Sequence, residues 1–72
     1  MIEQFIGKKI REKRKELQLT QEQFSLKCEL DRTYIASVEA GKRNISAKNL
    51  DKVIYALDTT FSEFFSEYEM RR

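Results

Sequence analysis

Hydrophobic residues recur along most of this chain at intervals of three and four residues, the spacing of an α-helix with one buried face. No segment alternates with period two, and proline is absent, so nothing in the pattern favours strands or hairpins. The chain is therefore predicted to be all-α. The two clearest helical runs are Phe5, Ile6, Ile10 and Leu17, and Leu50, Val53, Ile54 and Leu57.

Residues that favour helix ends divide this pattern into five helices. Residues 20–23 (Thr-Gln-Glu-Gln) and 60–63 (Thr-Phe-Ser-Glu) have the sequence of capping boxes. Asp31 and Ser46 are further N-cap candidates, and Gly41 is a natural helix terminator. The predicted helices are about 3–18, 20–28, 32–40, 46–57 and 60–68, with residues 69–72 expected to fray.

Length and composition predict one small domain, residues 1–72, with a thin core. The chain has one cysteine, no histidine and no phosphate-cradling glycine loop, so neither an enzyme nor a metal or other cofactor is predicted. A lone cysteine fits a reducing compartment, and no long apolar run suggests a membrane partner, so the protein is expected to be cytoplasmic. The predicted core residues are Ile6, Ile10, Leu17, Phe24, Leu30, Ile35, Val38, Leu50, Ile54 and Leu57.

The second and third predicted helices have the spacing of a helix-turn-helix over residues 20–41, because only residues 29–31 connect them. In such a motif the first turn of the second helix reaches the base edges in the major groove of double-stranded DNA. Arg32 can bind a guanine with two hydrogen bonds, although a phosphate contact or simple solvation is also open to it. Tyr34 could stack on bases, bind a phosphate or cover Leu30. The predicted base-reading residues are Arg32, Thr33, Tyr34 and Ser37.

Contacts to the DNA phosphates are expected from two places. The amides around Thr20 and Gln21 lie at the positive end of a helix dipole. The loop after the third helix carries Lys42, Arg43 and Asn44, although Lys42 could act by long-range attraction alone. Residues 1–43 carry ten basic and seven acidic side chains, against four and five in residues 44–72. This asymmetry fits DNA contact at one end, but ordinary solvated helix faces would also produce it.

The C-terminal part, about residues 47–68, is predicted to form a homodimer. The last helix carries more aromatic residues than one short helix needs for its own core, and an exposed apolar patch usually marks an interface. A two-fold dimer would match the half-sites of a palindromic operator. The alternative is that all the rings pack inside. The predicted interface residues are Tyr55, Phe64, Phe65 and Tyr68.

The segments 19–24, 30–35 and 38–46 together resemble the phage-repressor-like (Cro/XRE) helix-turn-helix family, and among its members the controller proteins of restriction–modification systems. The resemblance implies a five-helix lambda-repressor-like fold and a sequence-specific transcriptional regulator that acts on its own promoter. Antitoxins, phage repressors and protein-binding adaptors share this fold and are the alternatives. One departure is Glu29, where the family usually has glycine at a left-handed position.

The resemblance also implies roles for individual residues. Arg14 and Glu39 match positions that form a structural ion pair between the first and third helices. Glu22 matches an acidic residue that phage repressors offer to RNA polymerase. Arg43 and Asn44 lie where controller proteins approach the edge of a groove.

Overall fold

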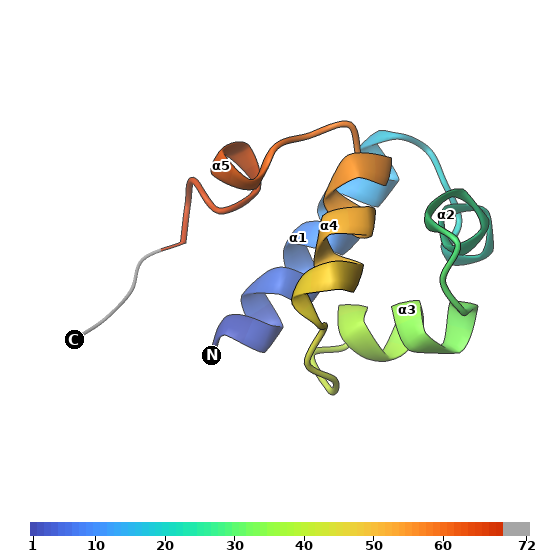
Figure 1. Cartoon of the computed structure of the whole chain (residues 1–72), viewed down its shortest axis with the longest axis horizontal. Coiled ribbons are helices and arrows are strands. Elements are labelled where there is room, and N and C mark those ends of the chain that lie inside the picture. The colour runs from blue at the N-terminus through green and yellow to red at the C-terminus, as the bar shows by residue number, and fades with distance from the viewer. Residues whose placement is uncertain (69–72) are drawn as a thin grey trace.

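The computed structural model describes residues 1–68, so the predicted fraying of residues 69–72 lies outside the described part. α3 packs against α1 and α2, and α2 packs against α4. Figure 1 shows α3 lying along one side of the molecule and α5 at another, away from α2 and α3. The predicted all-α fold with five helices is confirmed. The helices are α1 (Ile2–Glu16), α2 (Gln21–Cys28), α3 (Arg32–Glu39), α4 (Ala47–Ala56) and α5 (Phe61–Phe64).

The N-terminal ends of the last four helices begin at the predicted caps. The Thr20 hydroxyl accepts from the Gln23 amide, and the Gln23 side chain accepts from the Thr20 amide, so the first capping box is complete. The second box is only half formed. The Thr60 hydroxyl accepts from the Glu63 amide, but the Glu63 carboxylate accepts from the Thr59 hydroxyl instead of reaching back to the cap.

Four helices end in the same way. One residue after the helix has a left-handed conformation, and the amide of the next residue donates to the carbonyl five residues before it. After α3 this residue is Gly41 (φ 75°), as predicted. After α1, α2 and α4 it is Gln18 (φ 60°), Glu29 (φ 60°) and Asp58 (φ 58°). A side chain in this conformation costs roughly 1 kcal/mol, so three helix ends carry strain that only glycine would avoid.

The core combines residues from all five helices, and its eleven buried members are hydrophobic. Leu17 was predicted to belong to it but is 36% exposed. The reason is that α1 ends at Glu16, so Leu17 follows the chain away from the buried face. Leu30 and Leu50 are half-buried against the core. The buried hydrophobic residues are Ile6, Ile10, Phe24, Cys28, Ile35, Val38, Val53, Ile54, Ala56, Leu57 and Phe64.

Gly7 allows α1 to lie directly against the end of α3. A Cβ atom at this position would fall 2.3 Å from the carbonyl oxygen of Val38 and 2.7 Å from that of Glu39. Both neighbours are backbone atoms that cannot rotate away. The absence of a side chain at Gly7 therefore fixes how close α3 sits to the body of the protein.

α5 is a single turn and not the helix to Tyr68 that the sequence predicted. The Ser66 hydroxyl donates to the carbonyl of Glu63, which competes with continuation of the helix. Residues 65–67 then turn, and both Phe65 and Tyr68 pack on Phe5 of α1. Packing of these rings decides the path of the chain here, against the local helical pattern.

Candidate nucleic-acid interface

The start of α3 is held by Asp31, whose carboxylate accepts from the amides of Thr33 (3.0 Å) and Tyr34 (3.3 Å). One turn later Ile35 and Val38 are 0% and 1% exposed and anchor the helix from behind. Because these two side chains point inward, the first turn of α3 leaves Arg32 and Thr33 exposed. Ser37 is half-buried. The structure therefore presents two of the four predicted base-reading side chains freely to solvent.

The turn between α2 and α3 is built around Glu29 and Leu30. Glu29 takes the left-handed conformation that the family usually gives to glycine, and the Leu30 amide donates to the Ser25 carbonyl at 3.0 Å. Leu30 packs against the core, as predicted for an apolar plug. This turn sets the angle at which α3 leaves α2, and hence the direction of Arg32.

Tyr34 behaves differently from the other predicted reading residues. Its hydroxyl accepts from the Asn49 side chain at 3.1 Å, and the guanidinium carbon of Arg43 lies 4.8 Å from its ring centroid. The ring is half-buried and packs against the core. The structure thus gives Tyr34 a packing role and ties it to α4. Asn49 donates the hydrogen bond to its hydroxyl, and no local sequence pattern singles Asn49 out.

Arg14 and Glu39 form the ion pair that the resemblance implied. The Arg14 guanidinium donates to both Glu39 carboxylate oxygens, at 2.8 and 2.9 Å, and also to the Leu19 carbonyl at 2.8 Å. The two side chains are 8% and 3% exposed. Gln21 donates to the same carboxylate at 3.1 Å. This network connects α1, the start of α2 and the end of α3, so it fixes the helix-turn-helix as one rigid unit.

The predicted phosphate-binding residues lie in two separate places. Thr20 and Gln21 open α2, where the Thr20 amide is used by the capping box and the Gln21 side chain is held by Glu39. Lys42, Arg43 and Asn44 are exposed in the loop that follows Gly41. The loop leaves α3 through main-chain bonds from Gly41 to Val38 and from Lys42 to Ser37.

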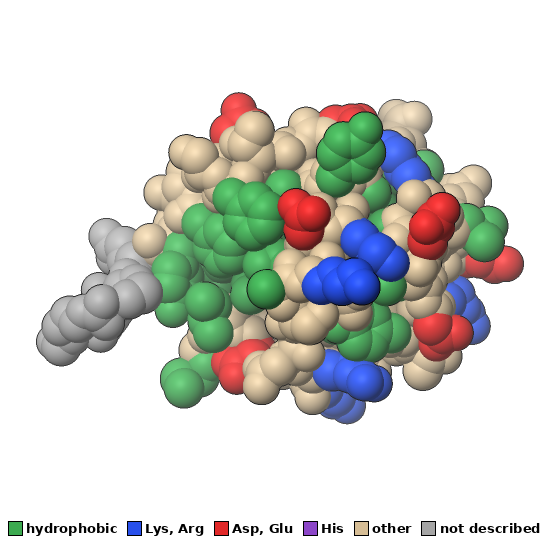
Figure 2. Space-filling model, viewed as in Figure 1, with side chains coloured by type: hydrophobic (Ala, Val, Ile, Leu, Met, Phe, Trp, Pro, Cys, Tyr) green, Lys and Arg blue, Asp and Glu red, His purple; other side chains and the backbone are tan. Residues whose placement is uncertain are grey.

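The C-terminal aromatic residues divide between core and surface, and this corrects the predicted interface. Phe64 is 0% exposed and lies against Phe5 and Phe65, so it cannot contribute to a dimer surface. Phe61, three residues earlier, is 45% exposed and Tyr55 is 84% exposed. Figure 2 shows hydrophobic side chains gathered at the end of the molecule that carries α5. A one-turn helix can bury only one face, and Phe64 occupies it.

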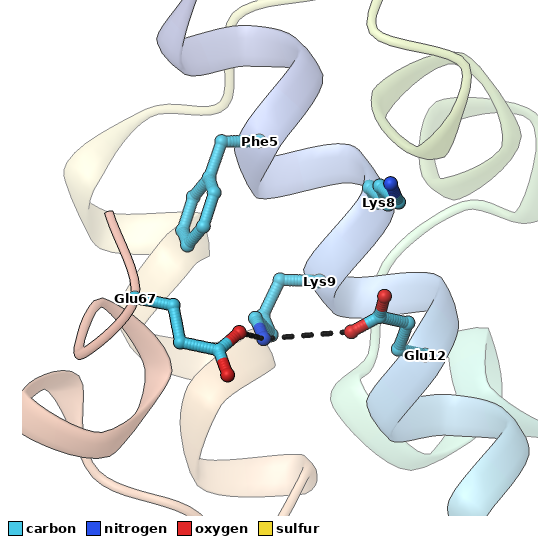
Figure 3. Close-up of a pocket in the computed structure, with 5 residues that line it drawn as sticks. All are labelled: Phe5, Lys8, Lys9, Glu12 and Glu67. Atoms are coloured by element: carbon cyan, nitrogen blue, oxygen red, sulfur yellow. Dashed lines mark hydrogen bonds and ion pairs between the residues drawn. The ribbon is translucent and has the colours of Figure 1, made fainter. Parts of the chain in front are cut away.

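An ion pair fastens this C-terminal segment to α1. Lys9 lies 2.8 Å from the Glu67 carboxylate and 3.4 Å from that of Glu12, and its ammonium is 5.7 Å from the centre of the Phe5 ring (Figure 3). The hydrogen bond to Glu67 raises the pKa of Lys9, and the hydrogen bond from Lys9 lowers the pKa of Glu67. No sequence pattern predicts this pair, since the two residues are 58 positions apart.

Three further structural findings concern the cysteine thiol, metal binding and membrane-spanning helices. Burial raises the pKa of the Cys28 thiol, which disfavours the reactive thiolate. Within residues 1–68, no cluster of three His, Cys, Asp or Glu side chains could hold a metal ion. In the same part of the chain, every helix is too short or too polar to cross a membrane.

The chain matches the family described as helix-turn-helix over residues 10–64, and it belongs to that family. Among its relatives, the control protein C.MunI of a Mycoplasma species is 48% identical over 64 residues, which cover 88% of this chain and 86% of the relative. The chain therefore belongs with the controller proteins, and the resemblance seen in the sequence is confirmed.

Solved structures agree with this assignment. The restriction–modification controller protein C.Esp1396I, solved as a tetramer with its natural 35 base-pair operator, superposes with a TM-score of 0.85 at 32% identity, over 92% of this chain and 87% of the other. The controller protein C.AhdI from Aeromonas hydrophila has a TM-score of 0.83 at 38% identity, over 88% of this chain and 96% of its own. The chain is a helix-turn-helix regulator of the restriction–modification controller type.

Proposed function

We propose that the protein binds a palindromic operator as a homodimer and places α3 of each protomer in a major groove. The observation that carries this proposal is the first turn of α3, where Arg32 and Thr33 are exposed while Ile35 and Val38 hold the helix from behind. An α-helix fits the major groove, and its first turn reaches the base edges. The relative C.Esp1396I has been solved in complex with its operator, which supports the same use of the fold.

Phosphate contacts would then fix the orientation of α3 on the duplex. The start of α2 offers amides at the positive end of a helix, beside Gln21. The loop with Lys42, Arg43 and Asn44 offers two cations and an amide just after the C-terminal end of α3. The Arg43 guanidinium lies over the Tyr34 ring, which limits its rotation. Tyr34 supports the reading surface through this contact.

The dimer would form through the aromatic surface near the C-terminal end. We propose an interface of Tyr55, Phe61, Phe65 and Tyr68, with Phe61 taking the place that the sequence assigned to Phe64. Tyr55 and Phe61 are among the most exposed large apolar side chains, and such side chains are favoured at interfaces. Two-fold symmetry would place two copies of α3 about one turn of DNA apart.

Regulation would follow from the position of the operator. We propose that the protein acts on its own promoter, in the cytoplasm of a bacterial cell, where its operator lies. Glu22 is exposed on α2 and is the residue proposed to contact RNA polymerase.

The test of base reading is footprinting on DNA upstream of the protein's own gene, followed by variants of Arg32. Arg32→Ala should relax specificity at one base pair in each half-site, worth roughly 1–3 kcal/mol. Arg32→Lys keeps the charge but not the paired donors, so it should show the same relaxed specificity with smaller loss of affinity. Equal weakening on all sequences would instead make Arg32 a phosphate contact.

Dimer formation is tested by sedimentation of Phe65→Asp, which should give monomers. Leu26→Asp is the matched control, because Leu26 is 74% exposed on α2 and is not one of the proposed interface residues. An unchanged dimer in Phe65→Asp would contradict the interface.

For the polymerase contact, Glu22→Gln should bind the operator normally and activate less. Normal activation would remove that role.

A further inference from the structure

A polar pocket of about 200 Å³ opens where α1, the start of α2 and α3 meet. Nothing in the sequence pointed to it, because its walls come from three separate segments. Liquid water occupies roughly 30 Å³ per molecule, so the pocket has room for a phosphate group with some of its hydration. The residues that line it are Arg11, Arg14, Gln21, Ala36, Glu39 and Ala40.

The pocket carries net positive charge. Arg14 and Glu39 neutralise each other through their paired hydrogen bonds, and Glu39 also accepts from Gln21. Arg11 is different, since no carboxylate within residues 1–68 pairs with it. The only uncompensated charge in the wall is therefore an exposed guanidinium, which favours an anion with two or more oxygens.

The pocket lies beside the proposed reading surface. Ala36 follows Arg32 by four residues and Thr33 by three, so it shares their side of α3. Ala36 and Ala40 have short side chains, which is why an opening exists between α3 and Arg11. A duplex lying along α3 would bring a sugar–phosphate strand past this opening.

We propose that Arg11 binds a backbone phosphate of the operator duplex in this pocket. The proposal rests on the DNA-binding function proposed above and adds a contact from α1. The ligand is the phosphodiester group itself, so Arg11 contributes equally on all sequences and carries no base specificity. It strengthens binding and adds a second phosphate contact, from α1, to those of the loop of residues 42–44.

The test compares Arg11→Gln with Lys13→Gln, measured as affinity for an operator duplex and for an unrelated duplex at several salt concentrations. Lys13 is the matched control, because it lies on the same helix but two residues away, on the opposite face. Arg11→Gln should weaken binding to both duplexes about tenfold and lower the slope of log K against log salt by about 0.9 for each protomer. Arg11→Lys should restore most of the slope, and circular dichroism should show an unchanged fold.

The outcomes separate this inference from the function on which it rests. If Arg11→Gln and Lys13→Gln bind alike while the wild-type protein binds its operator with strong salt dependence, Arg11 contacts no phosphate and only this inference fails. If the wild-type protein shows no salt-dependent binding to any duplex, the proposed function fails first. A loss confined to the operator sequence would also contradict a phosphate contact, because it would indicate base reading.

Discussion

The helix-turn-helix and the C-terminal segment are both short, but they are held in different ways. α2 and α3 begin at complete caps, are anchored by Phe24, Ile35 and Val38, and are tied to α1 by a buried ion pair. The C-terminal segment has one helical turn, a half-formed capping box and an ion pair in which the Glu67 side chain is 75% exposed. Aromatic rings provide most of its contact with α1.

This difference fits two different tasks. A surface that reads DNA must hold its side chains in place before binding, because ordering them afterwards would reduce affinity. A surface that forms a dimer can remain partly uncovered, because the second copy completes its burial. The more rigid helix-turn-helix is therefore the proposed DNA-binding surface, and the less constrained C-terminal segment is the proposed dimer interface.

The largest expected effect comes from breaking the buried ion pair. Glu39→Ala leaves the Arg14 guanidinium buried without its partner, which typically costs about 3–5 kcal/mol. Chemical denaturation should show this loss together with loss of operator binding. The double variant Arg14→Met/Glu39→Leu removes both charges and should recover much of the stability. Equal stability of wild type and Glu39→Ala would show that the ion pair does not stabilise the helix-turn-helix.

Phe64 and Phe61 test which aromatic rings of the C-terminal segment belong to the core and which belong to the proposed dimer interface. Phe64→Ala removes a fully buried ring and should cost about 3 kcal/mol, since the site lies in a short segment that can partly close. Phe61→Ala removes an exposed ring, so it should leave the monomer nearly as stable and weaken the dimer. Thermal unfolding and sedimentation equilibrium measure the two effects. The opposite pattern would return Phe64 to the interface.

Removing the cap of α3 should have an intermediate effect. Asp31→Ala leaves the amides of Thr33 and Tyr34 without their acceptor, at a cost of about 1 kcal/mol. Because the cap sets the first turn of α3, operator binding should fall further than stability alone explains. Ser46→Ala, which removes the cap of α4, is the control and should lower stability without this additional loss.

Glycine at the left-handed positions should stabilise both halves. Glu29→Gly and Asp58→Gly each relieve a side chain at φ near 60°, for a gain of up to about 1 kcal/mol in unfolding free energy. The gain is reduced by the greater freedom of glycine in the unfolded chain. Denaturation curves measure it. Destabilisation by Glu29→Gly would mean that its side chain makes a contact that compensates for the strain.

The smallest effect concerns the ion pair between Lys9 and Glu67. The lowered pKa of Glu67 adds stability that is present above its ordinary value of 4.5 and is lost as pH falls through the lowered value. The raised pKa of Lys9 adds stability below 10.5 that is lost as pH rises through the raised value. Lys9→Met should return the Glu67 pKa toward 4.5 in an NMR titration. An unchanged pKa would show that the two residues do not pair in solution.

The local sequence determined much of this protein. Hydrophobic spacing and cap residues predicted five helices, and the four predicted caps, Thr20, Asp31, Ser46 and Thr60, begin helices as expected. These features are determined within a few residues, by hydrogen bonds between a side chain and nearby amides, so sequence alone reveals them. The exposed position of Arg32 follows from the same local rule.

Tertiary packing decided the rest. The sequence could not show that Phe64 is buried and Phe61 exposed, that α5 stops after one turn, or that Tyr34 is held by Asn49, because each depends on residues far away in the chain. The pairing of Lys9 with Glu67 and the pocket beside Arg11 arise only when separate helices meet. Local hydrogen bonds determine where helices begin, whereas the contacts between helices determine which side chains remain free to bind.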